Sequence, residues 1–383
     1  MPTSITIGTG SVVLNSGVTT PTVSNLTMTG SSLQGTDDLT VSNLFSWSGG
    51  TVDTDINLNG TTNITGNVRI DTILTNSGTM NIGADYSSDD GSLINNSTVN
   101  WTAGDIIELG SAASITNNGT FNISGNNANG INFTNTGTLS KTAGAGTTSF
   151  TGSFANSGTV NANNGLLVFN GYSQTAGLTK LAGGNIDGTG GTTNFNGGTL
   201  AGVGTYAATD LNINNGATLA PGGSPGTLNI TGNLNLGSTS TTLIELGGTN
   251  QGVDYDFINV TGNVVLDGTL NVSLFGGFTG TTGNQFDIIR SGTSSMTGSF
   301  ATSNFPTGYS FGSSIFSPGS VLDYRLEILG ITPSGTSSGT VPSASVDEVL
   351  VLEENYDNLN IDDIIFPPDE SEEEYDDQVQ ICT

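Results

Sequence analysis

The chain has no histidine, and only five of its 383 residues are basic. Histidine is the commonest general base and the commonest zinc ligand, so its absence removes the simplest routes to acid–base catalysis and zinc binding. Five basic side chains cannot form a stripe that follows a phosphate backbone, and we expect no nucleic-acid partner. The net charge of −28 also opposes binding to an anionic membrane surface.

The chain has little that would fix it covalently or place it in a membrane. Its one cysteine, Cys382, has no partner for an internal disulfide. No stretch is apolar over the length that a transmembrane helix needs, so we expect no membrane insertion. The first twenty residues have neither the basic nor the apolar region of a signal peptide. A cytosolic protein and a segment of a longer secreted chain both fit these absences.

Small uncharged residues make up the polar bulk of the chain. Glycine occurs 57 times, and 10% of the residues are charged, whereas 34% are hydrophobic. Asparagine, threonine, serine and glycine favour strands and tight turns, and they are poor helix formers. The composition therefore favours an all-β fold.

One phrase recurs along the chain at intervals of roughly 20 residues. "TNNGTFNI" (Thr116–Ile123) has near-copies in "TNSGTMNI" (Thr75–Ile82) and "ANSGTVN" (Ala155–Asn161). The glycine of each copy, replaced by serine once, serves as a marker: Gly78, Ser97, Gly119, Gly137, Gly158, Gly198 and Gly216. The successive intervals are 19, 22, 18, 21, 40 and 18, and the interval of 40 covers two periods with one marker missing. Such a period is typical of solenoid proteins.

Within each repeat, apolar residues alternate with polar ones, which is the spacing of β-strands. Two or three short strands fit into one period, and this predicts one coil of a parallel β-helix. We expect the marker glycines to adopt the left-handed conformation of sharp turns. We also expect asparagines of neighbouring coils to pair, and four apolar residues to point inward in successive coils: Phe121, Ile123, Leu139 and Val160.

Several longer stretches resemble the repeat regions of large bacterial surface proteins. They include "DLTVSNLFSWSGGTV" (Asp38–Val52), "STVNWTAGDI" (Ser97–Ile106) and "NNGATLAPGGSPGTLNITGNLNLG" (Asn214–Gly237). Over about residues 26–330 the chain is similar to the passenger regions of autotransporter adhesins and filamentous-haemagglutinin-like exoproteins. The resemblance implies a right-handed parallel β-helix outside a Gram-negative cell, where it acts in adhesion or as a stalk.

Exoproteins of these families also carry a signal peptide with an N-terminal secretion domain, or a C-terminal membrane β-barrel. The sequence shows neither. We therefore expect the chain to be a segment of a longer exoprotein, displayed at the surface of a Gram-negative cell. An outer-membrane transporter is then an expected partner in its export.

The sequence divides into a solenoid and an acidic end. The proline-rich "APGGSPG" (Ala220–Gly226) predicts an irregular outward turn, because proline cannot donate to a strand ladder. Fourteen acidic residues and no basic one lie between Asp347 and Asp377, and their repulsion predicts a disordered tail. The expected segments are less regular first coils (1–55), a regular array (56–219), C-terminal coils and a cap (220–330), a linker (331–346) and the acidic tail (347–383).

Two groups of carboxylates are candidate sites. Asp85, Asp89 and Asp90 lie beside Tyr86, and we expect Arg69 about one coil below them. A glycosidase needs two carboxyl groups at a defined separation, but a solvated loop is the simpler interpretation of this cluster. The second group consists of Asp254 and Asp256.

Asp254 and Asp256, in "VDYDF", alternate as if on one face of a strand, and they are candidate calcium ligands. A structural role in a recurrent strand motif is the favoured alternative for this pair. "GGNIDGTGG" (Gly183–Gly191) resembles one calcium-binding nonapeptide turn, yet such turns bind calcium as an array and no tandem copy follows. We expect no other cofactor.

Three functions fit a β-helix of this composition. The first is a secreted, non-enzymatic adhesin or stalk, a rod of about 15 coils and ~70 Å, whose partner is a cell surface, a glycan or a matrix. The second is a polysaccharide-active lyase or glycosidase, which the inward placing of aromatics such as Phe121 and Phe257 disfavours. The third, an ice-binding solenoid, needs a regular flat array of threonines, and the linear spacing of threonine does not predict one.

Overall fold

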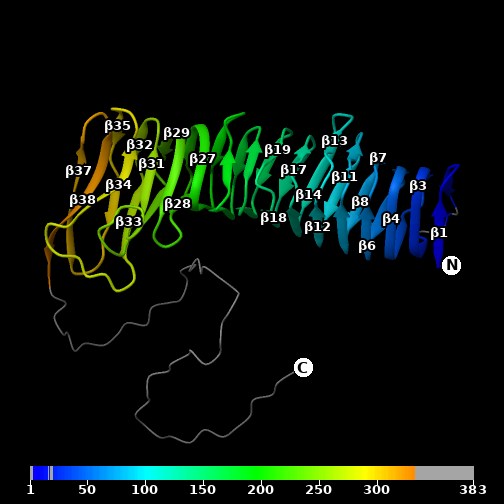
Figure 1. The fold of residues 1–383 in the computed structure, drawn as a ribbon, viewed down its shortest axis with the longest axis horizontal. Helices are drawn as coiled ribbons and strands as arrows, with labels where there is room; N and C mark the ends of the chain where they lie inside the picture. The colour runs from blue at the N-terminus through cyan, green and yellow to red at the C-terminus, as the bar shows by residue number, and fades with distance from the viewer. Residues whose placement is uncertain (1–2, 16, 18–19, 333–383) are drawn as a thin grey trace, which may run out of the picture. The chain divides into compact units, whose positions relative to one another are not determined.

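The computed structural model describes residues 3–15, 17 and 20–332, which belong to one unit, and their regular structure consists of β-strands. The strands wind into a parallel β-helix of about 12 coils, spaced about 20 residues apart (Figure 1). The predicted all-β solenoid is confirmed, although the coils are fewer than the expected 15 and span ~58 Å at ~4.8 Å per coil. No helix in these ranges is long and apolar enough to cross a bilayer. The acidic tail (347–383) and most of the linker lie outside the described residues.

Each regular coil contributes one strand to each of three parallel sheets. In one coil these strands are β8 (Ile73–Asn76), β9 (Thr79–Ile82) and β10 (Tyr86–Ser88). They pair in register with β11 (Ser92–Asn95), β12 (Thr98–Trp101) and β13 (Ile106–Glu108) of the next coil. Strands of one sheet therefore follow one another along the rod, as β6, β12 and β18 do along its lower side in Figure 1.

The remaining strands extend these three sheets in both directions. The first sheet also contains β5 (Ile56–Leu58), β14 (Ser114–Asn117), β17 (Asn132–Asn135), β20 (Phe154–Asn156), β23 (Tyr172–Gln174), β26 (Thr193–Phe195), β32 (Val264–Leu266) and β35 (Met296–Gly298). The second contains β6 (Thr61–Ile64), β15 (Thr120–Ile123), β18 (Thr138–Lys141), β21 (Thr159–Ala162), β24 (Leu178–Ala182), β28 (Thr218–Pro221), β30 (Thr241–Leu246), β33 (Thr269–Leu274) and β36 (Thr302–Asn304). The third contains β7 (Val68–Ile70), β16 (Ala128–Asn129), β19 (Thr147–Phe150), β22 (Leu166–Phe169), β25 (Asn185–Asp187), β31 (Phe257–Val260) and β34 (Gln285–Ser291).

Long bent strands pass from one sheet to the next at both ends of the regular array. They are β3 (Thr22–Gly35), β4 (Leu39–Asp53), β27 (Thr199–Ile213) and β29 (Thr227–Leu236). Two short strands, β1 (Ser4–Ile7) and β2 (Val12–Leu14), pair with β3 and begin the rod. The rod ends differently, because β38 (Leu322–Ile331) runs antiparallel to both β34 and β37 (Tyr309–Phe316).

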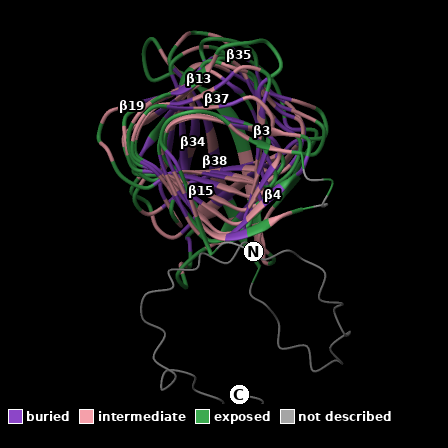
Figure 2. Ribbon diagram, turned by 90° about the vertical axis from the view of Figure 1, so that its right-hand side faces the viewer, coloured by how far each residue is buried: buried purple, intermediate pink, exposed green. Residues whose placement is uncertain are grey.

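Alternate residues of most strands fill the interior of the rod. Phe121, Leu139 and Val160 pair in register on successive coils and are fully buried, as Ile123 is, so these predicted inward positions are confirmed. A column of aromatic rings continues the core, with 5.1 Å between the ring centroids of Phe150 and Phe169. Viewed along the axis in Figure 2, the buried residues occupy the inside of the coil and the exposed ones its outer turns.

Asparagines of neighbouring coils pair inside the rod, as predicted. The amide nitrogen of Asn95 donates to the side-chain oxygen of Asn117 at 2.7 Å, and Asn117 donates to Asn135 at the same distance. The same nitrogen of Asn95 donates to the backbone oxygen of Thr120 at 3.0 Å. The ladder runs through Asn76, Asn95, Asn117, Asn135, Asn156 and Gln174. The ladder provides hydrogen-bond partners for buried backbone groups at one corner. A column of apolar side chains would leave these backbone groups unpaired.

The marker glycines do not owe their place to a left-handed backbone, which corrects the expectation from sequence. Only Gly198 and Gly216 among them have a positive φ, of 68° and 84°. At Gly137, by contrast, a Cβ atom would lie 2.1 Å from the carbonyl oxygen of Gly119 in the coil below. The missing marker is Gly177, whose φ is 76° and whose Cβ would also lie 1.9 Å from the oxygen of Gly158. Close approach of neighbouring coils therefore favours glycine at most positions of this corner, although Ser97 occupies one of them and a Cβ at Gly216 would meet no atom within 4 Å.

Candidate functional site

The acidic cluster at Asp85–Asp90 is held in ion pairs and backbone hydrogen bonds. Arg69 lies one coil below, as predicted, because its strand pairs Arg69 with Ser87. Its guanidinium contacts Asp71 and Asp89, each at 2.7 Å. The Asp85 carboxylate instead accepts the backbone N–H of Asp105 at 2.9 Å. The two carboxylates therefore serve different neighbours and do not face a common substrate position.

Tyr86 cannot assist this cluster. Its side chain points into the core, where burial raises the pKa of the phenol far above its ordinary value. Its hydroxyl has no hydrogen-bond partner among the described residues. A phenol that is buried on the far side of the strand cannot exchange a proton with a substrate outside the rod.

Carboxylates and side-chain amides also connect successive coils at the corners. Asp105 accepts the backbone N–H of Ala128 at 2.8 Å, as Asp85 accepts that of Asp105. Asn132 accepts the N–H of Ser153 at 2.9 Å, and Asn185 that of Thr205 at 2.8 Å. These side-chain oxygens accept hydrogen bonds from backbone N–H groups at the corners. The carboxylates and the amides therefore have a structural role here.

The calcium candidates Asp254 and Asp256 do not share a strand face, because β31 begins only at Phe257. Asp254 accepts the backbone N–H of Asn250 at 3.2 Å. Asp256 is buried and accepts the N–H of Gly226 at 2.9 Å and that of Glu245 at 2.8 Å. Asp256 thereby connects the end of the predicted turn, at Gly226, to β30. Among the described residues, no three acidic, cysteine or histidine side chains are grouped as a metal site.

Phe257 faces outward, contrary to the expectation from sequence. It pairs with Thr227, whereas the neighbouring Ile258 pairs with the inward Leu228. Its ring is buried, and the guanidinium of Arg290 lies 5.4 Å from the ring centroid. A cation over an aromatic face adds a favourable interaction to this burial.

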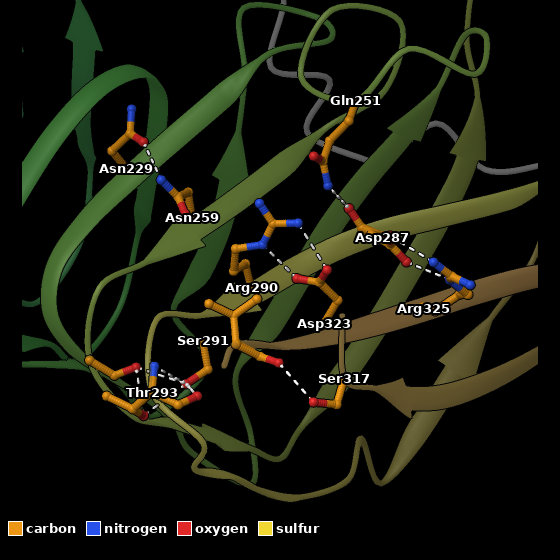
Figure 3. Close-up of polar contacts among 12 residues, drawn as sticks. Asn229, Gln251, Asn259, Asp287, Arg290, Ser291, Thr293, Ser317, Asp323 and Arg325 are labelled. Carbon is orange, nitrogen blue, oxygen red and sulfur yellow. Dashed lines mark hydrogen bonds and ion pairs between the residues drawn. The ribbon is translucent and has the colours of Figure 1, made fainter. Parts of the chain in front are cut away.

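The polar network near the C-terminal end joins the parallel sheet to the antiparallel cap (Figure 3). Arg290 of β34 contacts Asp323 of β38 at 2.7 Å through two parallel hydrogen bonds. Arg325 of β38 contacts Asp287 of β34 at 2.6 Å. Gln251 donates to the backbone oxygen of Asp287 at 2.8 Å and ties a loop to the same strand. These groups satisfy one another and leave no free acid–base pair at the cap.

Lys141 is fully buried, and sequence analysis gave no sign of it. Its Cα pairs with that of Ile123, so a cation occupies an interior position of β18. The ammonium group donates to the backbone oxygen of Gly125 at 2.7 Å and to the hydroxyl of Thr148 at 3.0 Å. Burial lowers the pKa of the lysine. No carboxylate of the described residues contacts it, which separates it from the paired arginines.

The outer side of the second sheet carries two regular ranks of polar residues, which we name the Thr-x-Asn face. One rank is Thr61, Thr79, Thr98, Thr120, Thr138 and Thr159, and the other is Asn63, Asn81, Asn100, Asn122, Ser140 and Asn161. All members of a rank pair in register on successive coils. The regular threonine array that the linear spacing did not predict is therefore present.

The asparagine rank of the Thr-x-Asn face is joined by hydrogen bonds between coils, as are the outer asparagines Asn194, Asn212 and Asn235 of the first sheet. The amide of Asn81 donates to Asn63 at 2.8 Å, that of Asn100 to Asn81 at 2.9 Å, and that of Asn122 to Asn100 at 3.1 Å. Within the described ranges, the hydroxyls of the threonine rank have no protein partner. They are thus available to whatever covers this face. The signal in the sequence was the pair Thr-x-Asn directly after most marker positions.

A shallow hollow of about 280 Å³ lies beside β23. Its lining includes Ser153, Phe154, Asn170, Tyr172 and Thr192, and it contains no carboxylate and no amine. Hydrolysis or elimination at a sugar needs acid–base groups at the bond that breaks. This hollow cannot supply them.

Comparison with known proteins adds no name to these features. No protein-family model matches the chain, and no curated protein matches it in sequence. The chemistry of the rod is therefore argued from its own residues.

Proposed function

We propose that this β-helix is a non-enzymatic adhesin or stalk segment of a large exoprotein at the surface of a Gram-negative cell. The observation that carries the proposal is the structural use of the carboxylates. Asp85, Asp105 and Asp256 accept backbone N–H groups of neighbouring coils or strands, and Asp89 is paired with Arg69. These acidic groups stabilise a rod, and a rod presents long flat faces to a partner.

Architecture supports a mechanical or adhesive role in a second way. The core is continuous from the first coils to the cap, since buried apolar residues extend from Ile7 to Ile328. A solenoid of this kind has no hinge between halves, so it holds its two ends at a fixed distance. On this proposal the partner is a cell surface, a glycan or a matrix, and an outer-membrane transporter exports the parent chain.

The test pairs a binding assay with a degradation assay on the same polysaccharides. Full-length protein is immobilised and exposed to cells, matrix proteins and a glycan panel, and reducing ends and unsaturated products are measured in parallel. We expect retention of at least one partner without product. Release of product that is lost in Asp85→Asn or Asp89→Asn would contradict the proposal and establish the alternative, a polysaccharide-active enzyme.

A further inference from the structure

The Thr-x-Asn face forms a two-dimensional lattice of side chains. Neighbouring coils repeat every ~4.8 Å, and the threonine and asparagine of one strand lie two residues, or ~6.6 Å, apart. The register is unbroken from β6 to β21, because each threonine pairs with the threonine of the next coil. Ser140 is the one departure in the asparagine rank.

The lattice is stiff as well as regular. Threonine is branched at Cβ and has restricted side-chain rotation, so its hydroxyl and methyl groups keep fixed positions. The hydrogen bonds between Asn63, Asn81, Asn100 and Asn122 hold the second rank. Side-chain ladders of this kind also keep a many-stranded sheet flat. A flat partner can therefore meet all six coils at once.

The chemistry of the face restricts the partner. No charged side chain points outward from the six strands, and the only charged residue within them, Lys141, is buried. The face offers a hydroxyl and a methyl group at each threonine, and no aromatic ring points outward from it. Small ligands bind in concave sites with apolar walls, and this face has none. An extended, uncharged lattice of hydrogen-bonding groups is the partner that fits.

We propose that the Thr-x-Asn face binds ice. The methyl groups order the adjacent water, as apolar surface does, and the threonine hydroxyls tether that water in fixed positions. Ice presents an extended, uncharged lattice of hydrogen-bonding groups, so the tethered waters continue into the crystal. The inference goes beyond the proposed function, since it requires neither a cell surface nor a receptor.

The linear sequence hid this array because the corners of the coils differ in length. From Thr61 to Thr159 the intervals between successive threonines of the rank are 18, 19, 22, 18 and 21 residues. The extra residues lie in turns between the strands, and the strands themselves stay in register. Spacing along the chain is therefore irregular where spacing in space is not.

The experiment measures partition of the fluorescently labelled full chain into a slowly growing ice crystal, together with thermal hysteresis in solution. We expect the protein to be enriched in the ice relative to a labelled globular protein of similar mass. The double variant Thr120→Arg/Thr138→Arg places two bulky cations in the middle of the rank, and we expect it to remain in the liquid.

The matched control carries the same two changes on the first sheet of the same coils. Thr116 and Thr134 pair in register and point outward there, so Thr116→Arg/Thr134→Arg should retain full enrichment. Circular dichroism of each variant checks that the rod is folded. Exclusion of the unaltered protein from ice, or equal loss in both double variants, overturns the proposal. Binding to crystalline cellulose or chitin that only the Thr120→Arg/Thr138→Arg variant loses, without enrichment in ice, overturns it in favour of a polysaccharide lattice.

Discussion

The carbonyl oxygen of Gly119 lies 2.1 Å from the place where a Cβ atom of Gly137 would be built. That oxygen also accepts the backbone N–H of Thr138 at 2.8 Å, so it cannot move away without breaking the ladder. At the scale of single residues, then, the glycine of the repeated phrase allows neighbouring coils to approach closely. Threonine follows the glycine because the strand begins there with an outward side chain.

We expect Gly137→Ala to lower the free energy of unfolding by about 1–3 kcal/mol, as overpacking of a rigid contact does. Gly223→Ala is the control, because its Cβ would meet only the side chain of Val203 at 3.6 Å and its φ is not positive. That variant should stay within ~0.5 kcal/mol of the unaltered protein. Denaturant unfolding measures both. Equal stability of the two variants would contradict the close-approach explanation.

Lys141 makes stability depend on pH in a predictable direction. Burial lowers the pKa of the lysine below its ordinary value of 10.5, so the unfolded chain binds more protons in the window between the two values. Stability of the rod therefore rises with pH through that window. We expect Lys141→Met to be more stable than the unaltered protein at pH 7, and this difference to shrink as the pH approaches 10.5. A methionine variant that is less stable at every pH would show that the hydrogen bonds of the ammonium outweigh its desolvation.

At the scale of elements, the antiparallel strand β38 ends the rod. A parallel solenoid leaves an unpaired ladder at its last coil, and such an edge invites pairing with other chains. Here β38 covers β34 with the opposite strand direction, and β37 covers β38 in turn. The two arginine–carboxylate pairs fix the register of this reversal.

We expect Asp323→Asn to lower the free energy of unfolding by about 1.5–3 kcal/mol, the range for a hydrogen bond to a charged group. Asp323 is fully buried, and its loss leaves Arg290 without its bidentate partner. Asp89→Asn is the matched control, because that pair has side chains 40% and 45% exposed. An exposed pair contributes at most ~1 kcal/mol. If both variants lose equal stability in a thermal melt, the cap is not fixed by its ion pair.

The sequence was sufficient to predict the repeated strands and their inward residues. It was not sufficient to predict contacts between segments that are far apart along the chain. Alternation and the marker period were enough to place Phe121, Leu139 and Val160 inward, because each strand carries its own pattern. The antiparallel pairing of the cap depends on register between strands about forty residues apart, as between Gln285 and Glu327. The same limit applies to Phe257, whose outward ring is buried and has Arg290 of another strand over its face.

The hydrogen bonds of the candidate carboxylates could not be predicted for a related reason. Asp85 and Asp89 are neighbours along the chain, and the position of Arg69 one coil below followed from the period. Which hydrogen bond each carboxylate accepts depends on corner geometry, and the composition of a corner does not specify it. The Thr-x-Asn face was missed because coil length varies while register does not.

At the scale of the whole molecule, the distribution of glutamates distinguishes the rod from the acidic tail predicted from the sequence. The three glutamates of the described residues, Glu108, Glu245 and Glu327, all lie in strands. Seven more follow Asp347. Because proteases need an accessible extended backbone, we expect a Glu-specific protease to remove the last ~35 residues and leave a resistant fragment that ends near residue 348. Mass spectrometry of the fragments measures this. Protection of Glu353 and Glu370 would mean instead that the tail docks on the rod.

Hydrogen bonds between coils run along the rod, since neighbouring strands are spaced in that direction. A pulling force on the two ends therefore loads the bonds of one coil boundary at a time, and the coils detach in sequence. Each detached coil of about 20 residues exchanges ~4.8 Å of rod for ~70 Å of extended chain. Under tension the molecule lengthens in steps and absorbs work at every step.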